Sequence, residues 1–340
     1  MSKVLEVKNL QVSFHTYAGE VKAVRGIDYS LDEQKTLAIV GESGCGKSVM
    51  VKTLMGLIRK PGEIKEGSQI LVDGKNILEF SKKEWQDYRG QDCSIVFQDA
   101  MAALNPTMTI GKQIMENVLN HKNVSKKEAW DQAVEMLSMV GLPDPEHTMK
   151  KYAHELSGGQ RQRVMIAIAL VCHPRILIAD EPTTALDVTI QKQIIDLIKN
   201  LQKQLGMSVI LITHDLGIVA NIAHDIAVMY GGKIMEKGSA RDIFYSPKHP
   251  YTWSLLKAVP RLDRNDEKLF AIEGMPPNLI GIGEGCPFAD RCEFCMNICR
   301  TKTPPVYRFD GEHRAQCWLH DPNASAEGVP FEVGGVLEHE

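Results

Sequence analysis

The chain has 340 residues, of which 44% are hydrophobic and 24% charged, and its formal net charge is −4. This composition is typical of a globular protein long enough for one large domain and a small one, and it excludes a disordered chain. The sequence has neither a basic excess nor a long run of like charge, so nothing indicates a nucleic-acid partner.

The N-terminal residues 1–14 alternate apolar and polar side chains and lack the apolar core of a signal peptide. The longest apolar run, residues 164–172, is about half the length that crosses a bilayer. We therefore expect no membrane span in this chain.

Hydrophobic periodicity predicts strands and helices that alternate along the first three-quarters of the chain. In chain order we expect a strand at 4–14, a buried strand at 37–40, a helix at 49–58, a capped helix at 125–140, a buried strand at 176–179, a helix at 188–205, a buried strand at 208–213 and a hairpin at 225–237. Such alternation is typical of an α/β fold with a parallel sheet.

The pattern changes near residue 260, where prolines, glycines and cysteines follow with little periodicity. We expect residues 259–320 to form a separate small module, too irregular to fold on apolar burial alone. Residues 321–340 are expected to form a loose tail, and residues 1–258 the large domain.

Residues 41–48 read GESGCGKS and match the phosphate-loop pattern G-x-x-x-x-G-K-[ST], with a buried strand before and a helix after. Glycines let backbone N–H groups wrap around a phosphate, and the helix N-terminus favours negative charge. Lys47 is expected to reach the β- and γ-phosphates, and Ser48 to bind Mg²⁺. The expected nucleotide-binding residues are Gly41, Glu42, Ser43, Gly44, Cys45, Gly46, Lys47, Ser48 and Val49.

Residues 176–181 read ILIADE, an apolar strand that ends in two carboxylates. By themselves, two acids at a strand end indicate only a solvated surface. In a chain with a phosphate loop, Asp180 is expected to hold the water shell of Mg²⁺. Glu181 is expected to polarise the water that attacks the γ-phosphate.

Residues 156–163 read LSGGQRQR, the most specific string in the chain. On this string the sequence resembles the nucleotide-binding subunits of ATP-binding-cassette (ABC) transporters, whose signature is LSGGQ. The resemblance covers residues 4 to about 258, with the motifs in the family's order. They are the phosphate loop, Gln98 in VFQDA, LSGGQ, ILIADE, Ala185-Leu186-Asp187 and His214 in LITHD.

The resemblance implies a fold and a role for each motif. The fold is a P-loop ATPase with a RecA-like core, an antiparallel β subdomain and a helical subdomain at about residues 99–160. Gln98 would contact Mg²⁺ or the attacking water, and His214 would bind the γ-phosphate and align Glu181. Asp187 would contact a partner subunit. The signature residues that would bind the γ-phosphate of the opposite subunit are Ser157, Gly158, Gly159 and Gln160.

An aromatic side chain upstream of the phosphate loop is expected to stack on the adenine. Phe14 is the first choice because it ends the first predicted strand, and Tyr17 is the alternative. Aromatic residues bury readily, so a purely structural role for Phe14 stays open.

The chain has one phosphate loop and one signature. Because the family's signature acts in trans, the resemblance implies a dimer that sandwiches two ATP molecules, formed with a copy of the chain or with a related ATPase subunit. ATP then holds the interface together, and hydrolysis releases it.

Two further strings indicate a transport function. Residues 243–260, IFYSPKHPYTWSLLKAVP, and residues 273–292, EGMPPNLIGIGEGCPFADRC, are similar to segments of dipeptide and oligopeptide importer ATPases. The resemblance implies a peripheral subunit on the cytoplasmic face of the inner membrane, with two permease subunits and, indirectly, an extracytoplasmic peptide-binding protein. The alternatives are a related importer of nickel or another small solute, a soluble ABC mechanoenzyme, and a regulatory ATP-binding module.

Five cysteines gather at the spacing Cys286-x5-Cys292-x2-Cys295-x3-Cys299-x17-Cys317. A reducing cytoplasm disfavours disulfides, and thiols at this density indicate a metal. Zinc takes four thiolates, often as two close pairs, and only one C-x2-C pair is present. A [4Fe–4S] cluster also takes four thiolates and tolerates irregular spacing.

The sequence is similar to a peptide-importer pattern, C-P-F-x-x-R-C followed by a cysteine seven positions on and a distal one. This resemblance implies Cys286, Cys292, Cys299 and Cys317 as ligands of a [4Fe–4S] cluster, with zinc as the alternative. Cys295 is either a bystander or a competing ligand. The preferred role of the metal is a structural staple, and redox sensing is the alternative.

Overall fold

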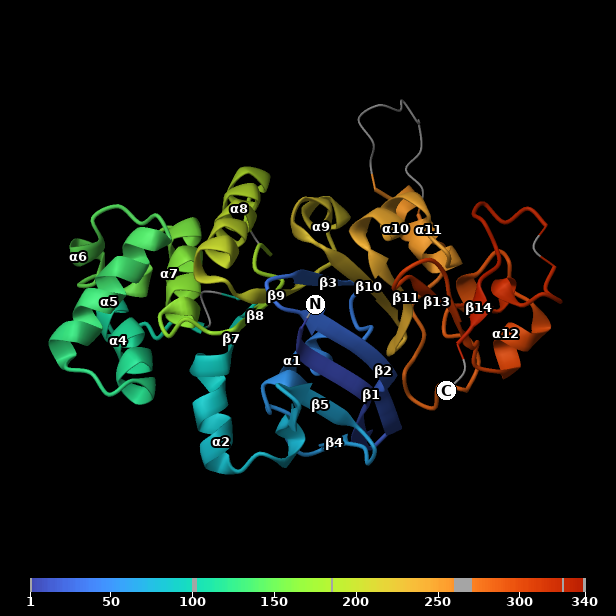
Figure 1. Ribbon diagram of the computed structural model, residues 1–340, viewed down its shortest axis with the longest axis horizontal. Helices are drawn as coiled ribbons and strands as arrows, with labels where there is room; N and C mark the ends of the chain where they lie inside the picture. Colours follow the sequence, from blue (N-terminus) through green and yellow to red (C-terminus); the bar gives the residue numbers. More distant parts are fainter. Residues whose placement is uncertain (1, 100–102, 185, 260–270, 326, 339–340) are drawn as a thin grey trace. The chain divides into compact units, whose positions relative to one another are not determined.

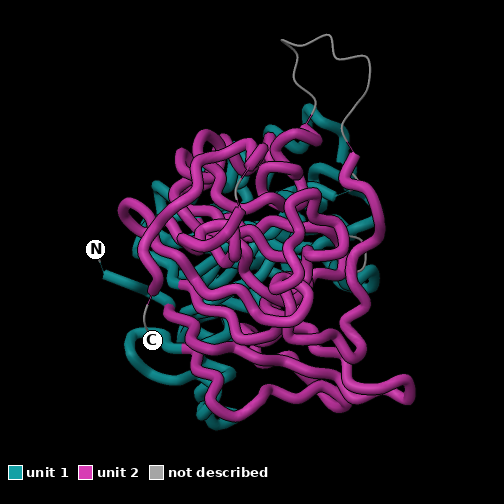
Figure 2. Tube along the Cα trace, turned by 90° about the vertical axis from the view of Figure 1, so that its right-hand side faces the viewer, with its two compact units in different colours: residues 1–5, 30–36, 71–213 teal, residues 6–29, 37–70, 214–340 magenta. Residues whose placement is uncertain are grey.

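Figure 1 shows the fold as a computed structural model, which describes residues 2–99, 103–184, 186–259, 271–325 and 327–338. The chain divides into two compact units, each built from segments that are distant in the sequence (Figure 2). Unit 1 comprises residues 1–5, 30–36 and 71–213, and unit 2 comprises residues 6–29, 37–70 and 214–340.

Unit 1 contains a parallel sheet with the strand order β9-β8-β7. These strands are β7 (Cys93–Val96), β8 (Ile176–Asp180) and β9 (Ser208–Thr213). Nearly all their residues are buried, as expected for short apolar strands in a parallel sheet. Helix α8 (Val188–Leu205) connects β8 to β9, and it ends where Gly206 adopts a left-handed conformation with φ 67°.

The helices of unit 1 pack mainly on one another. Helices α4 (Ile110–His121), α5 (Lys126–Met139) and α7 (Gly158–Leu170) contact each other in pairs, and α6 (Pro145–Thr148) contacts α5. The predicted capping box is present, since Ser125 and Glu128 exchange hydrogen bonds at the start of α5. Unit 1 also contains α2 (Lys82–Asp87), β6 (Lys75–Asn76) and the second half of β5 (Gln69–Val72).

Unit 2 contains the first strands and the phosphate-loop helix. Strand β1 (Lys3–Thr16) neighbours β2 (Gly19–Asp32) and pairs antiparallel with β4 (Gly62–Ile64). Strand β3 (Thr36–Val40) is fully buried and runs parallel to β10 (Asp225–Tyr230). Helix α1 (Lys47–Leu54) follows β3, and α9 (Leu216–Ile222) precedes β10.

The C-terminal segment continues the sheet of unit 2, whose strand order is β14-β12-β13-β11-β10-β3. Strands β10 and β11 (Lys233–Ser239) form the predicted hairpin, and β11 pairs with β13 (Arg314–Gln316). Strand β13 pairs with β12 (Val306–Arg308), which in turn pairs with β14 (Val336–Leu337). The helices of this part are α10 (Ala240–Tyr245), α11 (Pro250–Lys257) and α12 (Asn297–Thr301).

These pairings correct the expectation of a separate cysteine-rich module. The sheet runs on from β11 into β13, and Phe288 of the cysteine-rich segment is buried in the same apolar cluster as Tyr230 and Tyr251. The tail expected to be loose also contains a paired strand, β14. The expectation was wrong because hydrogen bonds between strands remote in sequence leave no periodic signal in short segments.

Within the described residues, every helix is too short or too polar to cross a membrane.

Candidate nucleotide-binding site and cysteine pocket

The phosphate loop lies in unit 2 between β3 and α1, as its sequence context predicts. All three of its glycines have positive φ angles: 155° at Gly41, 79° at Gly44 and 108° at Gly46. A Cβ at Gly41 would lie 2.1 Å from the carbonyl oxygen of Met229, and one at Gly46 would lie 2.3 Å from that of Ala23. Because backbone occupies the space of both side chains, the loop requires glycine at these positions.

Lys47 is buried at the start of α1. Its ammonium group donates hydrogen bonds to the carbonyl oxygens of Gly41 (2.7 Å) and Glu42 (3.0 Å). The cation is thus held over the loop whose backbone is expected to wrap the phosphates. Cys45 is also buried in the loop, and burial raises the pKa of its thiol.

Glu181 follows β8 in unit 1 and has a left-handed backbone conformation with φ 46°. Its backbone N–H donates to the carbonyl oxygen of Ile212 (2.9 Å). Its carboxylate accepts hydrogen bonds from Nε2 of Gln98 (3.2 Å) and Oγ1 of Thr184 (3.0 Å). The structure therefore brings together Gln98 and Glu181, two predicted catalytic residues that are 83 positions apart. Such unusual backbone conformations cluster at functional sites.

The signature string forms the N-terminus of α7. Ser157 is the N-cap, and it exchanges hydrogen bonds with Gln160 in a capping box. Gly158 and Gly159 form the first turn, close to Leu186 and Ile190 respectively. The helix begins at Gly158, so its N-terminal N–H groups lie in the signature itself.

Asp187 is the N-cap of α8, where its carboxylate accepts a hydrogen bond from the N–H of Ile190 (3.0 Å). Ala185, in the same predicted motif, lies outside the described residues. Asp180 ends β8 beside Glu181, and His214 is the first residue of unit 2 after β9. The predicted ATP-site residues are thus distributed over both units.

The two candidate adenine platforms differ in exposure. Phe14 is half-buried and pairs with Gly62 across the β1–β4 ladder, where its ring leaves no room for a Cβ. Tyr17 lies in the turn between β1 and β2 and is fully exposed at 115%. Exposure leaves the ring of Tyr17 available for stacking, which favours the alternative prediction over the first choice.

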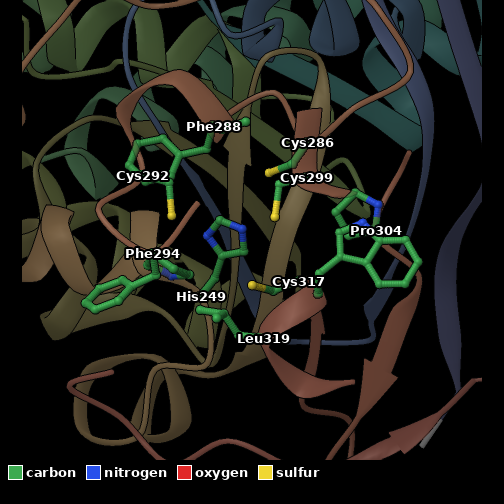
Figure 3. Close-up of a pocket in the computed structure, with 12 residues that line it drawn as sticks. His249, Cys286, Phe288, Cys292, Phe294, Cys299, Pro304, Cys317 and Leu319 are labelled. Carbon is green, nitrogen blue, oxygen red and sulfur yellow. The ribbon is translucent and has the colours of Figure 1, made fainter. Parts of the chain in front are cut away.

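Four cysteines line one pocket in unit 2, and they are the four that the family pattern selects. Figure 3 shows the sulfur atoms of Cys292, Cys299 and Cys317 directed toward the space around the ring of His249. The backbone N–H of Cys286 donates to the carbonyl oxygen of Cys299 (2.7 Å), so the stretches of chain that carry these two cysteines are hydrogen-bonded to each other. The other lining residues are Pro250, Phe288, Ala289, Phe294, Pro304, Trp318 and Leu319.

Burial raises the pKa of the Cys286 and Cys292 thiols to about 12 each, and raises that of Cys317 well above its usual range. In each case a backbone N–H two residues on hydrogen-bonds to the sulfur and opposes this increase. The donors are Phe288, Phe294 and Leu319. Amide hydrogen bonds of this kind stabilise an electron-rich sulfur.

Two residues distinguish this pocket further. Nε2 of His249 is buried and finds no hydrogen-bond partner among the described residues, while Nδ1 accepts from the N–H of Tyr251 (3.0 Å). Burial lowers the pKa of His249 to about 3, so its ring is neutral and Nε2 carries the proton. Cys295 does not line the pocket; its sulfur hydrogen-bonds to the carbonyl oxygen of Met296 (3.5 Å).

In the part of the chain that the structure describes, no three histidine, cysteine or acidic side chains are arranged to hold a metal ion. The four cysteines nevertheless line one pocket.

Sequence reasoning missed His249, Tyr251 and Arg291. Tyr251 and Arg291 contact the phosphate loop, through Glu42. All three lie in residues 243–260 and 273–292, the two strings that are similar to segments of peptide-importer ATPases. These strings do not indicate which groups the three side chains contact. For His249 and Tyr251 the only local signal in the sequence is that they lie on either side of one proline.

The phosphate loop, the acidic strand end and the LSGGQ helix start, carried on this α/β fold, define the class of ABC-type ATPases. Comparison with known proteins agrees. The ABC transporter family matches residues 24–184, and the family "Oligopeptide/dipeptide transporter, C-terminal region" matches residues 235–299. The chain belongs to the family of ATP-binding subunits of dipeptide and oligopeptide ABC transporters.

Similar relatives cover nearly the whole chain. The dipeptide transport ATP-binding protein DppD of Lactococcus lactis subsp. cremoris is 52% identical over 95% of this chain and 92% of its own length. The oligopeptide transport ATP-binding protein OppD of Escherichia coli is 48% identical over 93% of both chains.

Solved structures confirm the fold over the ATPase region. A dimeric post-hydrolysis state of the ATP-binding cassette MJ0796, bound to ADP and Pi, matches with a TM-score of 0.62 and 26% identity. It covers 70% of this chain and 99% of its own. The cbiO1 protein of Clostridium perfringens, part of the transporter complex cbiONQ, matches with the same TM-score, 30% identity and coverage of 72% and 91%.

Proposed function

We propose that this chain is the ATPase that powers di- and oligopeptide import through an ABC transporter, with the phosphate loop binding ATP and Glu181 and Gln98 acting in its hydrolysis. The observation that carries the proposal is the hydrogen bond from Gln98 to the Glu181 carboxylate. An acceptor carboxylate and an amide are the groups that orient and polarise an attacking water. Lys47 binds the β- and γ-phosphates, and Ser48 and Asp180 hold Mg²⁺. His214 aligns the γ-phosphate.

The catalytic unit is a dimer in which each signature serves the partner's ATP. The start of α7 supports this role, because Ser157, Gly158 and Gly159 place helix N–H groups and small side chains where a phosphate binds well. Asp187 lies at the same end of its own helix and contacts the partner subunit. The second subunit is a related ATPase or a copy of this chain.

The ATPase dimer is peripheral on the cytoplasmic face of the membrane. It binds two permease subunits, and an extracytoplasmic peptide-binding protein delivers the substrate to them. The test is uptake of labelled di- and tripeptides by cells that lack their own peptide-importer ATPases and express this chain with its permeases. Restored uptake of peptide supports the proposal. Uptake of nickel alone, or copurification with ribosomes or DNA in place of permeases, would contradict it.

Tyr17 is the adenine platform in this proposal, on the strength of its exposure. Replacing Tyr17 with alanine is expected to raise the Kd of a fluorescent ATP analogue about tenfold, since stacking of a base on an aromatic ring contributes about 1–3 kcal/mol. Phe14→Leu, which keeps an apolar side chain against Gly62, serves as the matched control and should change the Kd less than twofold. The reverse ranking would return the role to Phe14.

The cysteine pocket binds a [4Fe–4S] cluster through Cys286, Cys292, Cys299 and Cys317. Three observations support this: the four sulfurs line one pocket, three of them receive amide hydrogen bonds, and the Nε2–H of His249 lacks an acceptor in the described structure. The thiolates of a zinc site lie about 4 Å apart. A cluster places iron and sulfide between its four thiolates, and all four cysteines line the one pocket. The cluster would staple the C-terminal segment.

Cys317→Ser should abolish iron retention. We expect about four iron atoms per chain and brown colour in the anaerobically purified protein, and close to none in the variant, because a cluster that loses one of four thiolates is poorly held. Cys295→Ser is the matched control and should keep both iron and colour. Equal loss in both variants, or zinc in a colourless protein, would overturn the assignment.

A further inference from the structure

Glu42 of the phosphate loop is held from three directions, all within unit 2. Its carboxylate forms a two-pronged ion pair with Arg291, with Nη1–Oε2 2.6 Å and Nη2–Oε1 3.1 Å. Its N–H donates to the hydroxyl of Tyr251 (3.0 Å), and its carbonyl oxygen accepts from Lys47 (3.0 Å). Only the last contact comes from the loop's own helix. The other two come from the C-terminal half of the unit.

Arg291 is itself firmly placed, with 6% of its side chain exposed. Its guanidinium also donates to the hydroxyl of Tyr230 (3.0 Å) and to the carbonyl oxygens of Ile272 (3.1 Å) and Glu273 (2.9 Å). A guanidinium with this many fixed partners presents its charge in one position, so the paired carboxylate is fixed with it.

The two residues that contact Glu42 from the C-terminal half of the unit, Arg291 and Tyr251, also adjoin the cysteine pocket. Arg291 directly precedes Cys292 in the chain. The backbone N–H of Tyr251 donates to His249, whose ring lies in the pocket, and the ring of Tyr251 lies 5.2 Å from that of Phe288, which lines it (Figure 3). Arg291 and Tyr251 thus each connect the phosphate loop to residues that line the cysteine pocket.

A carboxylate in a loop that binds a triphosphate is electrostatically unfavourable unless a cation neutralises it. Glu42 is a quarter exposed, and Arg291 supplies that cation. Without Arg291 the loop would carry an uncompensated negative charge and a side chain free to move.

We propose that Arg291 and Tyr251 are positioning residues for ATP binding: Arg291, in the cysteine-rich segment, neutralises and orients the carboxylate of Glu42, and Tyr251, in α11, fixes the backbone N–H of Glu42. The cysteine-rich segment then contributes directly to nucleotide affinity, in addition to packing against the rest of unit 2. The inference rests on the proposed role of the loop in binding ATP and does not require the cluster.

The test measures the Kd of a fluorescent ATP analogue on the full chain, together with thermal unfolding of each variant. Arg291→Gln is expected to raise the Kd about tenfold, the size of effect for one hydrogen-bonded charge pair. Arg291→Lys, which keeps the charge, should stay within about threefold of the unchanged protein. Arg300→Gln is the matched control, because Arg300 is an exposed arginine of the same segment that pairs with Asp290, and it should have no effect.

The double variant Glu42→Gln with Arg291→Gln separates positioning from simple anchoring. Removing both charges should restore the Kd to within about threefold of the unchanged protein, because no uncompensated carboxylate remains. An Arg291 that only anchors the segment would lower the unfolding temperature and leave the Kd of every variant unchanged, which would overturn the inference.

Should Arg291→Gln fail to fold, Tyr251→Phe takes its place. It keeps the ring against Phe288 and removes only the acceptor of the Glu42 N–H, and the expected rise in Kd is about threefold. An unchanged Kd would count against the inference. If the unchanged protein does not bind the analogue at all, the proposed function fails first, so the two failures are distinguishable.

Discussion

Glu181→Gln is expected to lower the ATP hydrolysis rate at least about 100-fold while ATP binding is retained. Glutamine keeps the size of the side chain and its hydrogen bonds to Gln98 and Thr184, but it cannot take a proton or polarise water as a carboxylate does. In the proposed function hydrolysis releases the dimer, so the variant should accumulate as an ATP-bound dimer. Phosphate release and the molar mass in MgATP measure the two effects.

Glu135→Gln is the control for this experiment. Glu135 is an exposed residue of α5 in the same unit, so the substitution makes the same chemical change at a site that the proposal assigns no role. Its hydrolysis rate should be unchanged. Normal turnover in Glu181→Gln would show that the chain binds ATP as a regulatory module and would remove the catalytic assignment.

Gly41→Ala is expected to abolish ATP binding and to destabilise unit 2 by about 3 kcal/mol. The new Cβ would lie 2.1 Å from the carbonyl oxygen of Met229, which belongs to β10 and has no room to move. The loop must therefore leave its position between β3 and α1, and the backbone cradle for the phosphates is lost. Binding of the fluorescent ATP analogue and the unfolding free energy in urea report the two effects.

Gly44→Ala distinguishes the steric cause from the general strain of a positive φ. Gly44 also lies in the phosphate loop with φ 79°, but nothing lies within 4 Å of a Cβ placed there. The variant should lose only about 1 kcal/mol of stability, the cost of a left-handed alanine, and it should still bind ATP. Equal damage in both variants would show that backbone conformation alone limits the loop.

Most of the elements around the nucleotide site could be predicted because their signals are local. Helix α8 has the predicted bounds 188–205, β10 and β11 form the predicted hairpin, and the strand before the phosphate loop is buried. An apolar run, a capping residue and a glycine stop each act over a few positions, so one short string contains the whole signal. The helix at 49–58 was less accurate: α1 begins at Lys47 and ends at Leu54.

The choice between Phe14 and Tyr17 could not be made from sequence. Both are aromatic residues near the end of the first strand, and only the register of β1 on β4 shows that Phe14 is packed against Gly62 while Tyr17 is exposed. Strand register is a property of two segments, so a single string cannot reveal it.

By itself the sequence determined the chemistry of this protein: the phosphate loop, the ILIADE strand end and LSGGQ identify an ABC-type ATPase, and four cysteines mark the C-terminal segment. Only the tertiary structure decided that these cysteines share a pocket without Cys295, and that Arg291 holds Glu42 from 249 positions away. The reason is physical. Residue type and spacing specify what a short segment can bind, whereas ion pairs between distant segments depend on how the whole sheet is assembled.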